Sequence, residues 1–286
     1  MVYRSALYRS LALAALVCAV PAAAAAQSAT SGAIETQPLT QLDAWTVSAL
    51  SPQQGALPAD LWNRSDPAFL ASVFDRLPAT YESPAAQALA RRVLFSGGDA
   101  PRGDAQAAAR KRFEALGKMG AADELAVMAA GAGTSLNDPV VAQYAAQAEL
   151  ARGRRLDACA RGRSANVGDH PPPFILRLRA YCAAAAGDRA EADLALELAR
   201  GGGPANAADD AWYSGAISAV GGAPGARPLT ARYDNSLAAQ ISLAANLRPG
   251  PNPLANASTL ALVSVARADN APQPQRAQAA ALAYRR

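Results

Sequence analysis

The chain has 286 residues, of which 76 are alanine, and its 27 basic residues stand against 23 acidic ones. This near-neutral balance gives no support for a nucleic-acid binder. A chain of this length can bury a sizeable core, either as one domain or as an array of repeats.

Residues 1–26 have the three-part pattern of a secretory signal peptide. Arg4 and Arg9 precede an apolar run over 11–20, and a small-residue A-x-A pair ends at Ala26. The apolar run has about half of the roughly 20 residues that span a bilayer, which favours cleavage over anchoring. We therefore expect an exported, periplasmic protein with no stable membrane span.

Residues 27–64 are predicted to be an irregular lead-in, because three prolines interrupt them. The exception is one short helix expected from about Leu42 to Leu50. Regular helix punctuation begins at Ser65, which we interpret as an N-cap, with Asp66 as a first-turn acid and Pro67 at the first helical position. The apolar residues that follow fall at helical spacing and predict one buried face: Phe69, Leu70, Val73, Phe74 and Leu77.

The same device recurs along the chain, at Ser83-Pro84 and at Asp138-Pro139. No stretch of comparable length alternates apolar and polar residues as a strand does, and β-branched residues are sparse. The sequence therefore predicts an all-α protein.

Glycines close successive apolar-periodic segments at nearly constant intervals. Gly120, Gly153, Gly187 and Gly221 lie 33, 34 and 34 residues apart, and a period near 34 is typical of helix-turn-helix repeats. Over about 104–221 the chain resembles tetratricopeptide-like (TPR-like) repeats, although the family's Trp and Leu-Gly landmarks are absent. The resemblance implies a right-handed α-solenoid of stacked helix hairpins, which we assign to a helical-repeat domain over 65–221.

Residues 222–286 read as a linker followed by weaker helices. We expect these helices at about 236–246, 257–267 and 273–286. The sequence ends without a cap, which suggests a truncated relative of a longer protein. The whole chain is loosely similar to uncharacterised alanine-rich envelope proteins of proteobacteria, and this likeness implies no activity.

Two cysteines remain after export, Cys159 and Cys182. Their midpoint lies between His170 and Pro171, in the loop expected to join the second helix of one repeat to the first helix of the next. Residues equidistant from such a loop face each other in an antiparallel helix pair, so we predict a disulfide worth about 3 kcal/mol. A redox-active pair is the alternative, but the C-x-x-C spacing is missing.

Candidate catalytic groups are few. His170 is the single histidine, so it cannot assemble a multi-histidine metal site, and no G-x-S-x-G motif supplies a nucleophile. Glu82-Ser83 matches a pair used by lytic transglycosylases, but Ser83 has a sufficient role as an N-cap. We therefore expect no catalytic residue, metal or cofactor.

A basic segment over 152–179 is followed by an acidic segment over 188–210. The basic segment could bind an acidic partner, or the two segments could neutralise each other across neighbouring helices. Trp212 and Tyr213 are either core residues or contact points on a concave face. The candidate partner-binding residues are Arg152, Arg154, Arg155, Arg177, Arg179, Trp212 and Tyr213.

These patterns favour a non-enzymatic periplasmic scaffold, a helical-repeat module that binds one or more proteins of the cell envelope. The alternative is an accessory domain of peptidoglycan metabolism that binds glycan or a hydrolase.

Overall fold

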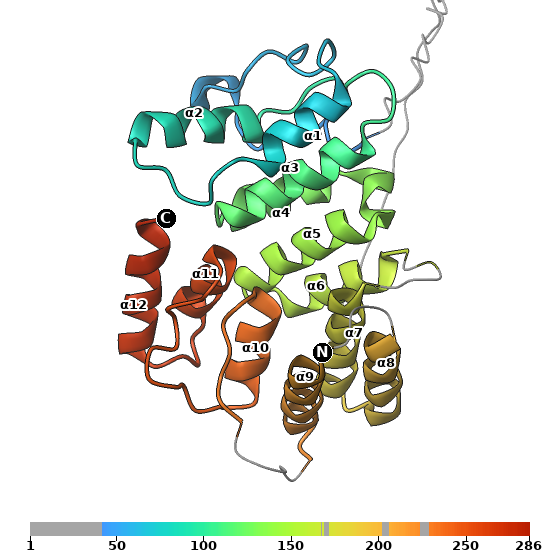
Figure 1. Cartoon of the computed structure of the whole chain (residues 1–286), viewed down its shortest axis with the longest axis vertical. Helices are drawn as coiled ribbons and strands as arrows, with labels where there is room; N and C mark the ends of the chain where they lie inside the picture. The colour runs from blue at the N-terminus through green and yellow to red at the C-terminus, as the bar shows by residue number, and fades with distance from the viewer. Residues whose placement is uncertain (1–41, 167, 169–171, 202–205, 224–228) are drawn as a thin grey trace, which may run out of the picture. The chain divides into compact units, whose positions relative to one another are not determined.

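The protein is all-α over the residues that the computed structural model describes, as predicted (Figure 1). These residues contain twelve α-helices and no strand beyond an isolated bridge between Thr230 and Arg248. The predicted signal peptide, residues 1–26, lies outside them. The described residues are 42–166, 168, 172–201, 206–223 and 229–286.

The twelve helices are short, with 9 to 14 residues each. Two 3₁₀ turns accompany them, η1 (Pro52–Gln54) and η2 (Gly133–Asn137). Among the described residues no helix is both long and apolar enough to cross a membrane. The α-helices are α1 (Pro67–Asp75), α2 (Pro84–Phe95), α3 (Gln106–Lys118), α4 (Ala122–Ala130), α5 (Pro139–Ala151), α6 (Arg155–Ser164), α7 (Pro173–Ala185), α8 (Arg189–Gly201), α9 (Ala207–Val220), α10 (Ser236–Ala244), α11 (Thr259–Arg267) and α12 (Gln273–Tyr284).

Proline follows a capping side chain at the predicted starts of α1, α2 and α5. The Ser83 hydroxyl accepts from the Ala86 N–H, and the Asp138 carboxylate accepts from the N–H groups of Val140 and Val141. At α1 the cap is Asp66 rather than Ser65, because the Asp66 carboxylate accepts from the Phe69 N–H at 2.8 Å. A carboxylate one residue before the proline can still accept from the backbone N–H groups of the first turn, which have no partner within the helix.

Only part of the expected apolar face of α1 is buried. Leu70 and Phe74 lie in the core, whereas Phe69 is 64% exposed and Val73 is 37% exposed. The helix packs mainly on α3, so a single neighbour covers a narrower stripe than the one we predicted.

The short helix predicted at Leu42 to Leu50 is wrong, because this segment forms turns. The Asp43 carboxylate accepts from the N–H of Trp45 at 2.8 Å, the N–H of Thr46 at 3.0 Å and the Thr46 hydroxyl at 2.7 Å. Such local side-chain bonds offer the backbone an alternative to a helix.

Glycines with left-handed backbone connect the helices of three pairs. Gly120, Gly153 and Gly187 have φ values of 71°, 75° and 84°, and they join α3 to α4, α5 to α6 and α7 to α8. In the turn that follows α9, Gly221 has an ordinary φ of −75°, and the left-handed residue is Gly222, with φ 73°. The predicted turn period is thus shifted by one residue at its last step.

Residues 40–286 form one compact helical unit, and helix α5 lies in its middle (Figure 1). It contacts α3, α4, α6 and α7, and it also contacts α10 and α11 from the C-terminal region. A solenoid repeat contacts only its neighbours, so the contacts of α11 with α3 and α5 go beyond that pattern. The structure shows paired helices, and it does not confirm the solenoid.

Small residues allow the helices around α5 to approach closely. Nine of the thirteen residues of α5 are buried, and most of them are alanine. A Cβ added at Gly117 of α3 would lie 2.5 Å from the ring of Tyr144 on α5, so this crossing requires glycine. The three predicted C-terminal helices are present as α10, α11 and α12, within two residues of the expected bounds.

Candidate functional site

The predicted disulfide joins α6 to α7. The Cα atoms of Cys159 and Cys182 are 5.8 Å apart, within the usual range for a disulfide. Cys159 is 6% exposed. The bond therefore links the second helix of one pair to the first helix of the next, as the sequence predicted.

Three of the predicted partner-binding arginines, Arg152, Arg177 and Arg179, bond to other groups of the protein. Arg152 pairs with Asp123 and with Glu149, each at 3.1 Å. Arg179 donates from α7 to the Gly162 carbonyl at 2.8 Å and the Ala165 carbonyl at 3.1 Å. It thereby satisfies carbonyl groups that the end of α6 leaves without helical partners.

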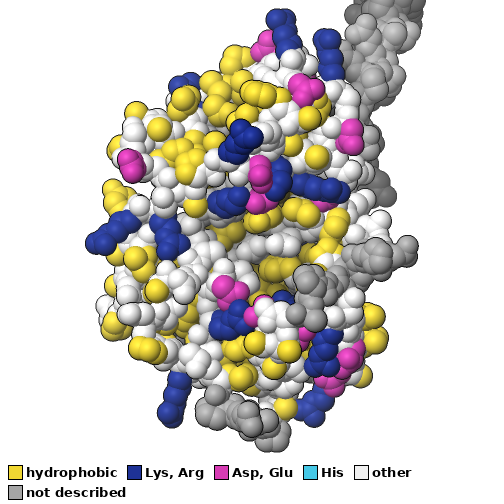
Figure 2. Space-filling model, in the orientation of Figure 1, with side chains coloured by type: hydrophobic (Ala, Val, Ile, Leu, Met, Phe, Trp, Pro, Cys, Tyr) yellow, Lys and Arg dark blue, Asp and Glu magenta, His cyan; other side chains and the backbone are white. Residues whose placement is uncertain are grey.

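Arg177 stacks against a predicted aromatic residue. Its guanidinium lies 4.3 Å from the ring centroid of Tyr213 and bonds to the Asp210 carboxylate at 2.8 Å. This ion pair joins the basic and acidic segments, as the neutralisation alternative expected. On the face that Figure 2 shows, basic side chains likewise lie beside acidic ones.

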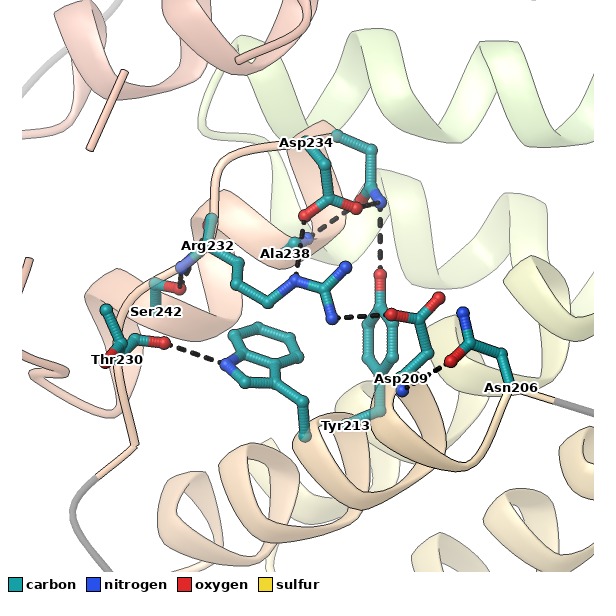
Figure 3. Close-up of polar contacts among 10 residues, drawn as sticks. Asn206, Asp209, Tyr213, Thr230, Arg232, Asp234, Ala238 and Ser242 are labelled. Atoms are coloured by element: carbon teal, nitrogen blue, oxygen red, sulfur yellow. Dashed lines mark hydrogen bonds and ion pairs between the residues drawn. The ribbon is translucent and has the colours of Figure 1, made fainter. Parts of the chain in front are cut away.

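Trp212 and Tyr213 are buried, at 7% and 2% exposure. The Trp212 indole N–H donates to the Thr230 carbonyl at 2.8 Å, and the Tyr213 hydroxyl accepts from the Asn235 amide at 3.1 Å (Figure 3). The two rings meet edge to face, with centroids 5.0 Å apart. In this conformation a partner would meet the charged groups around the rings rather than the ring faces.

Arg232, which was not among the predicted partner-binding residues, completes this group. Its guanidinium lies 5.1 Å from the centroid of the Trp212 ring and pairs with Asp209 at 2.7 Å and Asp234 at 3.2 Å (Figure 3). The signal that could have found it is the run Arg232-Tyr233-Asp234-Asn235, which ends at the residue that caps α10. We name Arg177, Asp209, Asp210, Trp212, Tyr213, Arg232 and Asp234 the arginine–aromatic cluster.

The surroundings of the cluster shift the pKa of two of its groups. Burial raises the pKa of Tyr213 to about 12, although the Asn235 hydrogen bond works in the opposite direction. Burial works to lower the pKa of Arg232, but the Asp209 hydrogen bond and the charges of Asp234 and Asp209 outweigh it, so that the pKa is raised. Both groups therefore keep their protons at neutral pH.

The remaining predicted arginines, Arg154 and Arg155, are exposed at the start of α6. Arg154 has a side chain 57% exposed, and its closest carboxylate, Asp157, is 4.0 Å away. Arg155 is exposed, and no ion pair is found for it among the described residues. Leu156 follows and is 75% exposed. We name Arg154, Arg155 and Leu156 the α6 patch.

The candidate catalytic residues gain no support from their surroundings. Ser83 caps α2 through its hydroxyl, and His170 lies outside the described residues. Within those residues no group of three or more His, Cys, Asp or Glu side chains is placed to hold a metal ion.

The fold and this site define an all-α protein of paired helices with one disulfide and an internally paired arginine–aromatic cluster. Comparisons with models of protein families, with curated protein sequences and with solved structures found no significant match. The likeness to TPR-like repeats therefore rests on the helix pairs and their turn spacing alone.

Proposed function

We propose that this protein is an exported, non-enzymatic binding module that attaches to another protein of the cell envelope. The pairs α3/α4, α5/α6 and α7/α8 would be its TPR-like units, arranged as a short right-handed solenoid that α10 and α11 cover on one side. A periplasmic location is part of the proposal. The disulfide supports it, because such bonds persist in oxidising compartments.

The observation that carries the proposal is the α6 patch. It combines two exposed guanidinium groups with a leucine that is 75% exposed. Arginine is enriched at protein interfaces, and an apolar side chain between charged groups gives a partner both area and orientation. The other predicted arginines with internal partners contribute less to binding, because a new partner would have to displace their present contacts.

Site-directed photo-crosslinking in cells tests the proposal directly. A photoreactive residue placed at Leu156 is expected to give a discrete adduct with one envelope protein. The matched control is Leu89 of α2, which is also apolar and 58% exposed. Adducts of equal yield at both positions, or none at Leu156, would contradict the proposal.

Charge reversal sharpens this test. The double variant Arg154→Glu/Arg155→Glu is expected to abolish the adduct at Leu156 without altering the fold, since both side chains lie at the surface. The control reverses Arg92, an exposed residue of α2, and should leave the adduct unchanged.

Export has a separate test. The intact mass of the protein recovered from cells is expected to lack residues 1–26 and two further hydrogens, which the disulfide removes. A chain that keeps these residues and both thiols would contradict the periplasmic location and leave the α6 patch to be tested on its own.

An accessory role in peptidoglycan metabolism is the second candidate. A cleft of about 430 Å³ beside the arginine–aromatic cluster is lined by groups that bond to hydroxyls and amides, among them Arg232, Asp234, Asn252 and Asn256. Co-sedimentation with purified cell wall separates the two candidates, because a module that binds only protein stays in the supernatant.

A further inference from the structure

We propose that a second cleft, at the N-terminal ends of α3 and α5, binds a small zwitterionic ligand: an amino acid or short peptide with a free carboxylate and a free ammonium group. This site goes beyond the proposed partner binding and shares no residue with the α6 patch.

The cleft has a volume of about 520 Å³. This lies within the range of roughly 300–1,000 Å³ that is typical of small-molecule sites. Its walls come from four segments that are distant in sequence: the lead-in at Asp43 and Trp45, residues 100–110 with the start of α3, residues 134–141, and Asn166. A hydrogen bond from the Ala44 N–H to the Ser135 hydroxyl, at 3.1 Å, holds the first segment to the third.

A buried carboxylate organises one wall of the cleft. The Asp138 side chain is 2% exposed, and each of its two carboxylate oxygens accepts two hydrogen bonds. Oδ1 caps α5, whereas Oδ2 accepts from Gln106 Nε2 at 2.9 Å and from Arg110 Nε at 2.6 Å. Asp138 is thus saturated, and its role is to hold Gln106 and Arg110 in place before a ligand arrives.

Arg110 offers the group that would bind a carboxylate. Its bond to Asp138 uses Nε, and the described residues place no partner on the two terminal nitrogens. The side chain is 42% exposed. The terminal edge of a guanidinium matches a carboxylate with two parallel hydrogen bonds, and such bidentate pairs are strong and directional.

Asp43 offers the group that would bind an ammonium. Its Oδ1 accepts three hydrogen bonds within its own turn, from Trp45 and Thr46, whereas no bond among the described residues uses Oδ2. Because the turn holds Oδ1, the position of Oδ2 is set by the backbone.

The charges around the cleft balance. Arg110, Asp43 and Asp138 line the cleft, and the buried Arg112 donates to the Ala44 carbonyl, between the lining residues Asp43 and Trp45. Burial lowers the pKa of Arg112 to about 9 and the Asp43 carboxylate opposes this shift, so that Arg112 keeps its charge at neutral pH. A ligand of one sign would leave a net charge in this partly buried place, whereas a zwitterion preserves the balance.

Isothermal titration calorimetry with three probes tests the proposal. Alanylalanine carries both charges, N-acetylalanine carries only the carboxylate and alaninamide carries only the ammonium. We expect the dipeptide to bind at least tenfold more tightly than either single-charge probe. Equal binding of all three probes, or no binding of the dipeptide at millimolar concentration, would overturn the proposal.

Variants locate the binding to this cleft. Arg110→Gln and Asp43→Asn are each expected to weaken the dipeptide about tenfold, and Asp43→Asn keeps the oxygen that its turn requires. Arg91→Gln is the matched control, because Arg91 is also 42% exposed and pairs with Glu124 at 2.6 Å but does not line the cleft. Equal loss in the control would show that the effect is not local and would overturn the assignment.

Should Arg110→Gln fail to fold, Arg110→Lys keeps the positive charge but loses the bidentate edge, and it should still weaken the dipeptide several-fold. Unchanged affinity in this variant and in Asp43→Asn would also overturn the proposal. The crosslink at Leu156 tests the partner-binding function independently, because it does not depend on this cleft.

Discussion

The region around Arg112 and the region around Arg177 both place a guanidinium over aromatic rings, but they stabilise it differently. Arg112 is fully buried, and its guanidinium carbon lies 5.3 Å from the ring centroids of both Trp45 and Trp62. Its guanidinium donates to the backbone carbonyls of Leu94, Ser96 and Ala44. Arg177 instead bonds to a carboxylate, with both side chains partly exposed.

The two arginines differ in burial, and the cores that they contact differ in size. About half of the buried residues in each core are alanine. The core around Arg112 is the larger, with 25 buried residues and five aromatic ones, Trp45, Trp62, Phe74, Phe95 and Phe113. The core around Arg177 has 18 buried residues and three aromatic ones, Tyr181, Trp212 and Tyr213. Aromatic side chains bury far more apolar area per residue than alanine. The region around Arg177, with the smaller core, has the disulfide and the ion pairs of the arginine–aromatic cluster in addition, and we infer that it depends on them.

The largest effect is expected from Arg112→Met. The substitution leaves the buried carbonyls of Leu94 and Ala44 without the guanidinium donors, whereas the Ser96 carbonyl keeps the Trp62 indole N–H at 3.2 Å. The loss should be about 3–5 kcal/mol of unfolding free energy. Urea denaturation measures it. Arg92→Met, in which an exposed arginine loses one bond to the Gly55 carbonyl, is the control and should lose less than about 1 kcal/mol. Equal losses would show that Arg112 has no special role.

Removal of the disulfide should come next. The double variant Cys159→Ala/Cys182→Ala is expected to lose about 3 kcal/mol of unfolding free energy, because a cross-link over 23 residues lowers the conformational entropy of the unfolded chain. The same measurement in wild-type protein with reductant should agree. A change below about 0.5 kcal/mol would contradict a structural role for this bond.

Alkaline pH should reveal the burial of Tyr213. Its pKa of about 12 in the folded protein exceeds the ordinary value of 10, so between these values the unfolded chain releases a proton that the folded chain keeps. The stability from this group is complete below pH 10 and is lost as the pH rises towards 12. Relative to wild type, Tyr213→Phe should gain about 1 kcal/mol between pH 7 and pH 11. A difference in unfolding free energy between the two proteins that stays constant from pH 7 to pH 11 would contradict a raised pKa for Tyr213.

The smallest effect concerns the ion pair between Arg177 and Asp210. A double-mutant cycle with Arg177→Met and Asp210→Asn should give a coupling of about 0.5–1 kcal/mol, typical of partly exposed pairs. A coupling as large as the effect of Arg112→Met would remove the distinction between the two regions.

The sequence allowed the local features to be predicted. Proline after a capping residue marked the starts of α1, α2 and α5, glycines marked the turns, and the midpoint between the cysteines predicted their bond. Each of these signals lies within a short stretch of chain, where backbone geometry leaves few alternatives.

The long-range contacts could not be predicted in this way. Arg112 stands in the run ARKRFE, which has the composition of a solvated helix face, and only the approach of Trp45 and Trp62 buries it. Likewise, nothing local indicates that α11 packs on α5. Arg232 follows the glycine- and proline-rich stretch 221–228, whose composition predicts a linker rather than a site.

Hydrogen exchange before and after selective reduction of the disulfide tests the central claim that the two regions are stabilised by different means. We predict that amides of α6, α7 and α8 exchange faster once the bond is reduced, whereas amides of α1 and α3 keep their protection. Equal acceleration in both sets of helices, or none in either, would contradict this account.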